Sequence, residues 1–147
     1  MLGKMDGKLA TEFNMSQQAI DAFGALVGQR APHLQRKPGT GHHSDPEAAK
    51  SVGLRGPVAY SLHYYAHVAD LMLQRYGARW LDGGEMAVAF IKPVCAGDDI
   101  KVAIGERAVQ RPEQVADGQQ GLQVDIYNQL GELVAAGVAT LRDDAEG

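Results

Sequence analysis

The 147-residue chain lacks several features that would assign it to common protein classes. It holds one cysteine, Cys95, which excludes an internal disulfide and a multi-cysteine zinc site. We expect Cys95 to be a small core or loop residue. No stretch approaches the roughly 18 apolar residues of a membrane-spanning helix. Residues 1–10 contain charges at Lys4, Asp6 and Lys8 and no apolar run, which argues against a signal peptide.

The chain also lacks a block of like charge. Its net charge is −4, with acidic and basic residues mixed along the sequence, so nucleic acid is not an expected partner. No repeat, low-complexity tract or linker divides the sequence. A length of 147 residues with 45% apolar content suits one domain with its own core. We therefore expect a single cytoplasmic domain over residues 1–147.

Helix signals dominate the first half of the chain. Ser16 precedes residues with helical spacing that ends near Gly28, and Asp45-Pro46 is a typical helix start. Residues 58–76 predict a long helix opened by Gly56-Pro57. Its apolar positions at helical spacing are Val58, Leu62, Tyr65, Ala66, Ala69, Leu73 and Tyr76, and Ala59, Leu71 and Met72 widen the apolar surface. Apolar residues cover so much of this helix that other structure should wrap it.

Strand signals dominate the second half. A weak strand pattern at 8–14 is joined by clear ones at 86–91, 100–109, 122–127 and 133–141. Residues 97–99 and 128–131 carry turn signals, and residues 111–120 predict a polar, mobile loop. This order predicts an α+β fold in which an antiparallel sheet curls around one buried helix.

Several motifs together resemble the MaoC-like dehydratases, which include the R-specific enoyl-CoA hydratases. They are His43-Ser44-Asp45-Pro46-Glu47-Ala48-Ala49, Gly56-Pro57-Val58-Ala59, Phe90-Ile91-Lys92-Pro93-Val94, Gly97-Asp98 and Asn128-Gln129-Leu130-Gly131-Glu132. The similarity covers about residues 15–141. It implies a hot-dog fold, a homodimer or higher homo-oligomer, and a site for acyl thioesters, commonly of coenzyme A.

The active-site motifs depart from the family pattern at two places. Family hydratases carry an Asp-x-Asn-Pro-x-His run, whose histidine falls on His43 and whose aspartate falls on Pro38. The family's Pro-Ile-Ala-His-Gly-like run reads Pro57-Val58-Ala59-Tyr60-Ser61 here, so Tyr60 replaces a histidine and Ser61 a glycine. The sequence therefore has a histidine at the position of the family's base and no acid at the position of the family's aspartate.

These matches give each residue an expected role. His43 is the expected base, because an imidazole titrates near neutral pH. The backbone N–H of Ser61 is the expected oxyanion donor, because the first amides of a helix lack intrahelical partners. Tyr60, His42 and Asp45 are candidates for the second proton-transferring group. Adjacent side chains of an extended segment point opposite ways, which counts against His42, and helix capping competes with this role for Asp45.

Other residues near this segment have less specific roles. Asp45, Gly56 and Pro57 are assigned to the substrate-binding part of the site, with helix capping as the competing role of Asp45. Arg36, Lys37, Lys50 and Arg55 are either a docking patch for nucleotide phosphates or ordinary solvated side chains. His63 and His67 have a metal-binding i, i+4 spacing without the glutamate of the zinc-protease pattern, and we expect no metal or other cofactor.

Three functions stay open at this point. The first is a hydratase or dehydratase, a lyase acting on an acyl thioester or related small substrate. The second is a non-catalytic acyl-thioester-binding subunit, or half of a pair whose partner supplies the acid missing at Pro38. The third is a thioesterase, for which the sequence offers no identifiable nucleophile or acid.

Overall fold

One five-stranded antiparallel sheet forms the body of the structure, a computed structural model that describes residues 5, 7–34, 37 and 39–147. Its strands are ordered β1-β3-β4-β5-β2 across the sheet. The strand bounds are β1 Leu9–Asn14, β2 Gly84–Phe90, β3 Asp99–Ile104, β4 Gln119–Tyr127 and β5 Leu133–Arg142. The β4–β5 hairpin turns at Gly131, whose φ of 74° favours glycine. The predicted sheet, including its weak first strand, is confirmed.

Four α-helices accompany the sheet: α1 Gln17–Arg30, α2 Pro46–Ser51, α3 Ser61–Tyr76 and α4 Ala78–Gly83. Both predicted N-caps are present, because the Ser16 side chain accepts from the Ala19 N–H and that of Asp45 from the Glu47 N–H. The sequence did not predict α4, and α3 begins three residues later than expected. Within the described residues no helix is long and apolar enough to cross a membrane.

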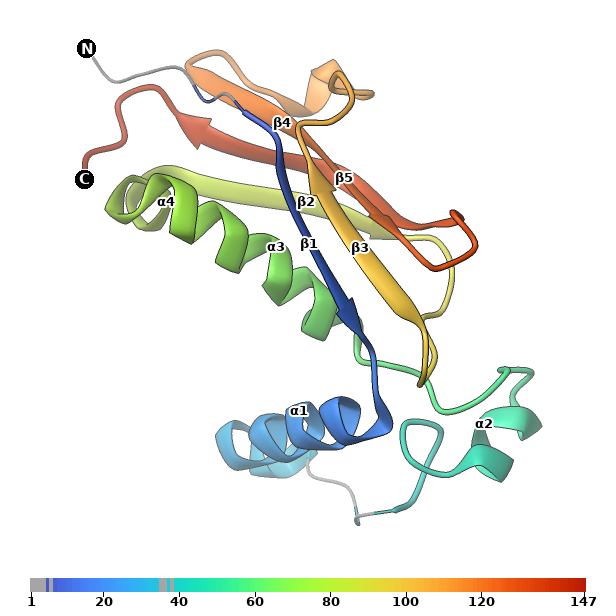
Figure 1. Cartoon of the computed structure of the whole chain (residues 1–147). Coiled ribbons are helices and arrows are strands. Elements are labelled where there is room, and N and C mark those ends of the chain that lie inside the picture. Colours follow the sequence, from blue (N-terminus) through green and yellow to red (C-terminus); the bar gives the residue numbers. More distant parts are fainter. Residues whose placement is uncertain (1–4, 6, 35–36, 38) are drawn as a thin grey trace.

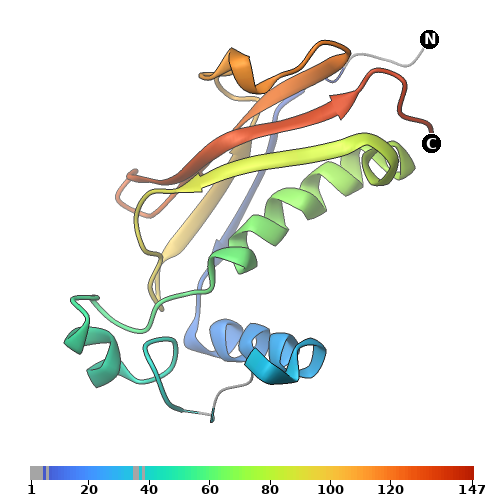
Figure 2. The same ribbon diagram turned by 180° about the vertical axis from the view of Figure 1, so that it is seen from behind.

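The sheet curves over α3, which lies along its concave face, while α1 and α2 lie beyond one end of the sheet (Figures 1 and 2). The core forms where α3 meets the sheet, and Tyr64, Val68 and Met72 are the helix residues buried there. Leu62 and Leu73, two apolar positions of the predicted helix, are 62% and 39% exposed. The sheet buries one side of α3 and leaves these positions uncovered, so the described residues do not wrap the helix on all sides as expected.

The segment between β3 and β4 lies on the opposite face of the sheet from α3 (Figure 1). Arg107 donates two hydrogen bonds to the buried carboxylate of Asp125, at 2.8 and 2.7 Å. The Gln110 N–H donates to the side chain of Gln123. These contacts hold the first residues after β3 against β4. The loop at 111–120, predicted to be mobile, follows directly after them. Within this loop, the Val115 side chain packs against Gly121, where an added Cβ would lie 2.5 Å from Val115 Cγ2.

Candidate functional site

The loop before α2 brings two histidines together. Residues 42–44 form a turn in which the N–H groups of Ser44 and Asp45 donate to the Gly41 carbonyl, at 3.1 and 2.9 Å. The ring centroids of His42 and His43 are consequently only 4.3 Å apart. The expectation that these side chains point opposite ways was wrong, because it assumed an extended segment and the backbone turns here.

A short hydrogen bond fixes the orientation of the His43 ring. Its Nδ1 lies 2.7 Å from the carbonyl oxygen of Val58. A carbonyl can only accept, so Nδ1 carries the hydrogen of this contact and Nε2 holds the lone pair of the neutral ring. The His43 carbonyl in turn accepts from the Gln17 side chain of α1 at 2.9 Å. This arrangement suits a general base that acts through Nε2.

The residues that precede α3 are extended, not helical. The Val58 N–H donates to the His42 carbonyl at 2.9 Å, and Val58 forms an isolated antiparallel bridge with Cys95. On either side of Val58, the Ala59 N–H donates to the Val94 carbonyl and the Pro57 carbonyl accepts from Ala96. This pairing competes with helix formation and delays the start of α3. It also places the Val58 carbonyl beside His43.

Tyr60 joins the histidine loop to the first turn of α3. It is the N-cap residue, so Ser61 supplies the first backbone N–H of the helix. The Tyr60 ring stacks on the His43 imidazole, with centroids 3.9 Å apart and an interplanar angle of 14°. A Cβ at Gly24 of α1 would lie 2.8 Å from the Tyr60 hydroxyl, so this glycine makes room for the tyrosine. The His43 loop, the start of α3 and α1 therefore meet around Tyr60 and His43.

The remaining predicted site residues have identifiable surroundings. Asp45 caps α2, with its carboxylate 3.0 Å from the Glu47 N–H, which fits its competing role. Pro57 is buried, and no atom would crowd a Cβ at Gly56, so its backbone is open on that side. Pro38 lies outside the described residues, as does Arg36. Lys50 forms an ion pair with Glu47 within α2.

His63 and His67 belong to a stack of rings between α3 and the N-terminal elements. His63 stacks on Phe23 of α1 at 4.8 Å, and His67 stacks on Phe13 of β1 at 3.9 Å. Desolvation by burial lowers the pKa of both histidines, and for His63 the neighbouring His67 lowers the pKa further. No group of three or more potential metal ligands occurs among the residues the structure describes. The rings pack as neutral aromatic groups.

This stack predicts that acid destabilises the protein. A histidine whose folded pKa lies below its ordinary value of 6.5 takes up a proton on unfolding at pH values between the two. The stabilisation is therefore complete above pH 6.5 and is lost as the pH falls, by at most about 1.4 kcal/mol per pH unit for each histidine. Urea unfolding of wild type and His63→Phe between pH 5 and 8 measures this, with exposed His33→Phe as the control. An equal pH slope in wild type and His63→Phe would contradict the assignment.

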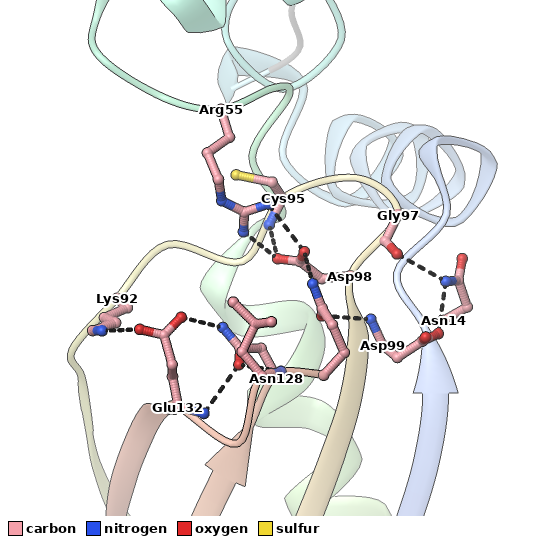
Figure 3. Close-up of polar contacts among 11 residues, drawn as sticks. Asn14, Arg55, Lys92, Cys95, Gly97, Asp98, Asp99, Asn128 and Glu132 are labelled. Atoms are coloured by element: carbon pink, nitrogen blue, oxygen red, sulfur yellow. Dashed lines mark hydrogen bonds and ion pairs between the residues drawn. The ribbon is translucent and has the colours of Figure 1, made fainter.

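Sequence reasoning missed a polar cluster around Asp98 (Figure 3), which includes Cys95, the residue that pairs with Val58. Asp98 is 2% exposed and receives two hydrogen bonds from Arg55, at 3.2 and 2.7 Å. The Cys95 N–H and the Gln129 side chain also donate to the Asp98 carboxylate. Desolvation opposes ionisation of Asp98, but these donors together lower its pKa. The sequence indicated only a turn here, because the Arg55 partner lies 43 residues away.

Comparisons with known proteins agree with this architecture. A family model described as MaoC like domain matches residues 42–128. No curated protein matches the sequence. Among solved structures, the (R)-hydratase from A. caviae involved in PHA biosynthesis has 19% identity and a TM-score of 0.66, over 92% of this chain and 93% of that chain.

Two further solved structures show the same fold. The MaoC-like dehydratase from Rhodospirillum rubrum is 22% identical with a TM-score of 0.61, and the alignment covers 95% of this chain and 91% of that one. The C-terminally truncated HadBC complex from Mycobacterium tuberculosis, a 3R-hydroxyacyl-ACP dehydratase, is 21% identical with a TM-score of 0.58, over 94% and 98%. These likenesses identify the antiparallel sheet and its helix as a hot-dog fold. Because the family model spans more than half of the sequence, this chain belongs to the MaoC-like domain family.

Proposed function

We propose that this protein is a hydratase or dehydratase of acyl thioesters in which His43 is the base and the Ser61 N–H the oxyanion donor. The observation that carries the proposal is the contact between His43 Nδ1 and the Val58 carbonyl, which leaves the lone pair on Nε2 of a ring that stacks on Tyr60, the N-cap residue of α3. Membership of a family of hydratases and dehydratases supports the same reaction class.

The proposed chemistry has two parts. His43 Nε2 takes a proton from water as the water oxygen bonds to the β-carbon of the enoyl thioester. The double-bond electrons move toward the thioester carbonyl, whose oxygen becomes an enolate. The Ser61 N–H and the positive end of the α3 dipole stabilise this charge, and one such donor is worth about 3–4 kcal/mol in other enzymes. Protonation of the α-carbon completes the hydration, and the reverse sequence is dehydration.

We propose that one of the rings beside His43 protonates the α-carbon. Tyr60 and His42 have centroids 3.9 and 4.3 Å from the His43 ring, so both lie in the reacting region. We propose Tyr60 first, because it also caps the helix that holds the enolate oxygen. The Asp45 carboxylate already accepts the capping hydrogen bond of α2, so Gly56 and Pro57 are the residues proposed to line the substrate-binding part of the site.

In a second candidate function, this chain is one subunit of a catalytic pair. Pro38 stands at the position of the family's acid, and a side chain without an ionisable group cannot replace it. The M. tuberculosis dehydratase that shares this fold is itself a complex. In that case, this chain binds the acyl thioester and a partner subunit supplies the acid.

The exposed apolar face of α3 supports a homodimer for the hydratase or dehydratase function. Leu62 is 62% exposed, and on β2 and just beyond it Phe90 and Ile91 are 45% and 54% exposed. β2 is also an edge strand of the sheet, with backbone groups available for pairing. A second copy placed there covers both the strand edge and the apolar side of the helix.

One assay tests the proposed function. Purified protein is mixed with enoyl-CoA esters of increasing chain length, and the enoyl absorbance and the free thiol are followed together. Loss of enoyl absorbance without thiol release is the expected result. Thiol release indicates a thioesterase, and binding without turnover indicates a non-catalytic or paired subunit. Tyr60→Phe and His42→Asn then distinguish the two proton donors, and we expect the larger loss of rate in Tyr60→Phe.

A further inference from the structure

One buried carboxylate binds both the residue that precedes the extended segment before α3 and the strand piece that pairs with this segment. Arg55, two residues before Pro57, binds Asp98 through its two terminal guanidinium nitrogens, and this planar fork restrains orientation as well as distance. The same carboxylate accepts from the Cys95 N–H at 2.9 Å, and the Asp98 N–H donates back to the Cys95 carbonyl at 3.0 Å. Asp98 therefore fixes both the segment that carries Val58 and the strand piece that pairs with it (Figure 3).

The position of the Val58 carbonyl depends on these two attachments. Two backbone hydrogen bonds flank Val58 on the side that faces Cys95. The Ala59 N–H donates to the Val94 carbonyl at 2.7 Å, and the Ala96 N–H donates to the Pro57 carbonyl at 2.8 Å. The Val58 carbonyl in turn accepts a hydrogen bond from His43 Nδ1 at 2.7 Å. Hydrogen bonds and short backbone segments therefore connect the Arg55–Asp98 ion pair to the His43 imidazole.

We propose that Arg55 and Asp98 are positioning residues for His43: their ion pair holds the Val58 carbonyl where it selects the Nδ1–H tautomer and aims Nε2. The role of His43 as base rests on the proposed function, whereas the effect on its tautomer does not. Neither residue touches the reacting atoms. Their contribution acts through geometry, and a misplacement of about 1 Å can cost about 100-fold in rate.

The chain contains a matched control for this pair. Arg107 also donates two hydrogen bonds to one buried carboxylate, that of Asp125, through Nε and Nη2 where Arg55 uses Nη1 and Nη2. Its side chain is 42% exposed against 60% for Arg55. The aspartates are equally buried, at 1% and 3% side-chain exposure. The Arg107 pair lies on the face of the sheet opposite α3. Loss of either ion pair should therefore have similar effects on stability, but only one should affect His43.

The test compares Arg55→Gln, Arg55→Lys and Arg107→Gln in the full-length protein. The ¹⁵N chemical shifts of the His43 ring report its tautomer and titration without any need for activity. We expect Arg55→Gln to move these shifts toward a mixture of tautomers, and Arg55→Lys, which keeps the charge without the fork, to do so partially. Arg107→Gln should leave them at wild-type values. With an enoyl-CoA substrate, kcat should fall about 10- to 100-fold in Arg55→Gln with KM nearly unchanged.

A double variant separates positioning from general destabilisation. If Arg55 acts through His43, Arg55→Gln lowers kcat no further in a His43→Asn background. Unchanged ¹⁵N shifts and titration of His43 in folded Arg55→Gln, or in Arg55→Lys if the glutamine variant does not fold, would overturn the proposal. Equal changes in Arg107→Gln would overturn it as well. A wild type without hydratase activity rejects the proposed function, but the tautomer measurement still decides whether the pair positions His43.

Discussion

Replacing His43 with asparagine is expected to lower the rate of enoyl-thioester hydration by about 10²–10⁴-fold, the usual contribution of a general base. The asparagine amide can still donate to the Val58 carbonyl that now accepts from His43 Nδ1. The variant therefore keeps the hydrogen bond that orders the loop, while it removes the Nε2 lone pair and the stacking of the imidazole on Tyr60. Initial rates of enoyl absorbance loss, measured from pH 6 to 9, give the effect.

The controls for His43→Asn follow from the same geometry. His33→Asn changes an exposed histidine of the short 3-10 turn at Pro32–Leu34 and should retain the wild-type rate. Thermal unfolding of His43→Asn should resemble that of wild type, because its buried neighbours are unchanged. A fully active His43→Asn would reject His43 as the base and direct attention to His42, whose ring centroid lies 4.3 Å away.

Local signals predicted the parts of the fold that depend on local contacts. Ser16 and Asp45 cap helices in the structure because each side chain reaches an amide two or three residues ahead, a contact visible in the sequence. The β4–β5 turn was predictable for the same reason, since Gly131 adopts a positive φ. These elements needed no knowledge of distant residues.

The errors occurred where distant residues decide the structure. Gly56-Pro57 resembles a helix start, but backbone pairing with residues 94–96 keeps Val58 and Ala59 extended. Apolar residues occur on more than one side of α3, and contact with the sheet selects the side that carries Val68. At the candidate site, the family motif pointed to His43 and Ser61, and their roles stay predictions. The motif alone did not show that the Val58 carbonyl orients His43 or that Asp98 supports Val58.

The close approach of β2 and β5 predicts the largest loss of stability. A Cβ at Gly137, in the middle of β5, would lie 1.9 Å from the Ala87 carbonyl oxygen and 2.7 Å from the Val88 Cα. Both obstacles are backbone atoms of the neighbouring strand, so no side-chain rotation relieves the clash. Gly137→Ala should therefore lower the free energy of unfolding by about 3 kcal/mol, the upper part of the usual range for overpacking.

Gly56→Ala is the matched control for Gly137→Ala, because a Cβ at Gly56 meets no atom within 4 Å and the residue has no positive φ. Its unfolding free energy should stay within about 0.5 kcal/mol of wild type, as for most surface substitutions. Urea denaturation followed by circular dichroism compares the two variants. Equal midpoints for Gly137→Ala and wild type would show that β2 does not approach β5 this closely in solution. A shifted midpoint would instead show that the sheet tolerates no side chain at Gly137, because the edge strand beside α3 must pack directly on the β5 backbone.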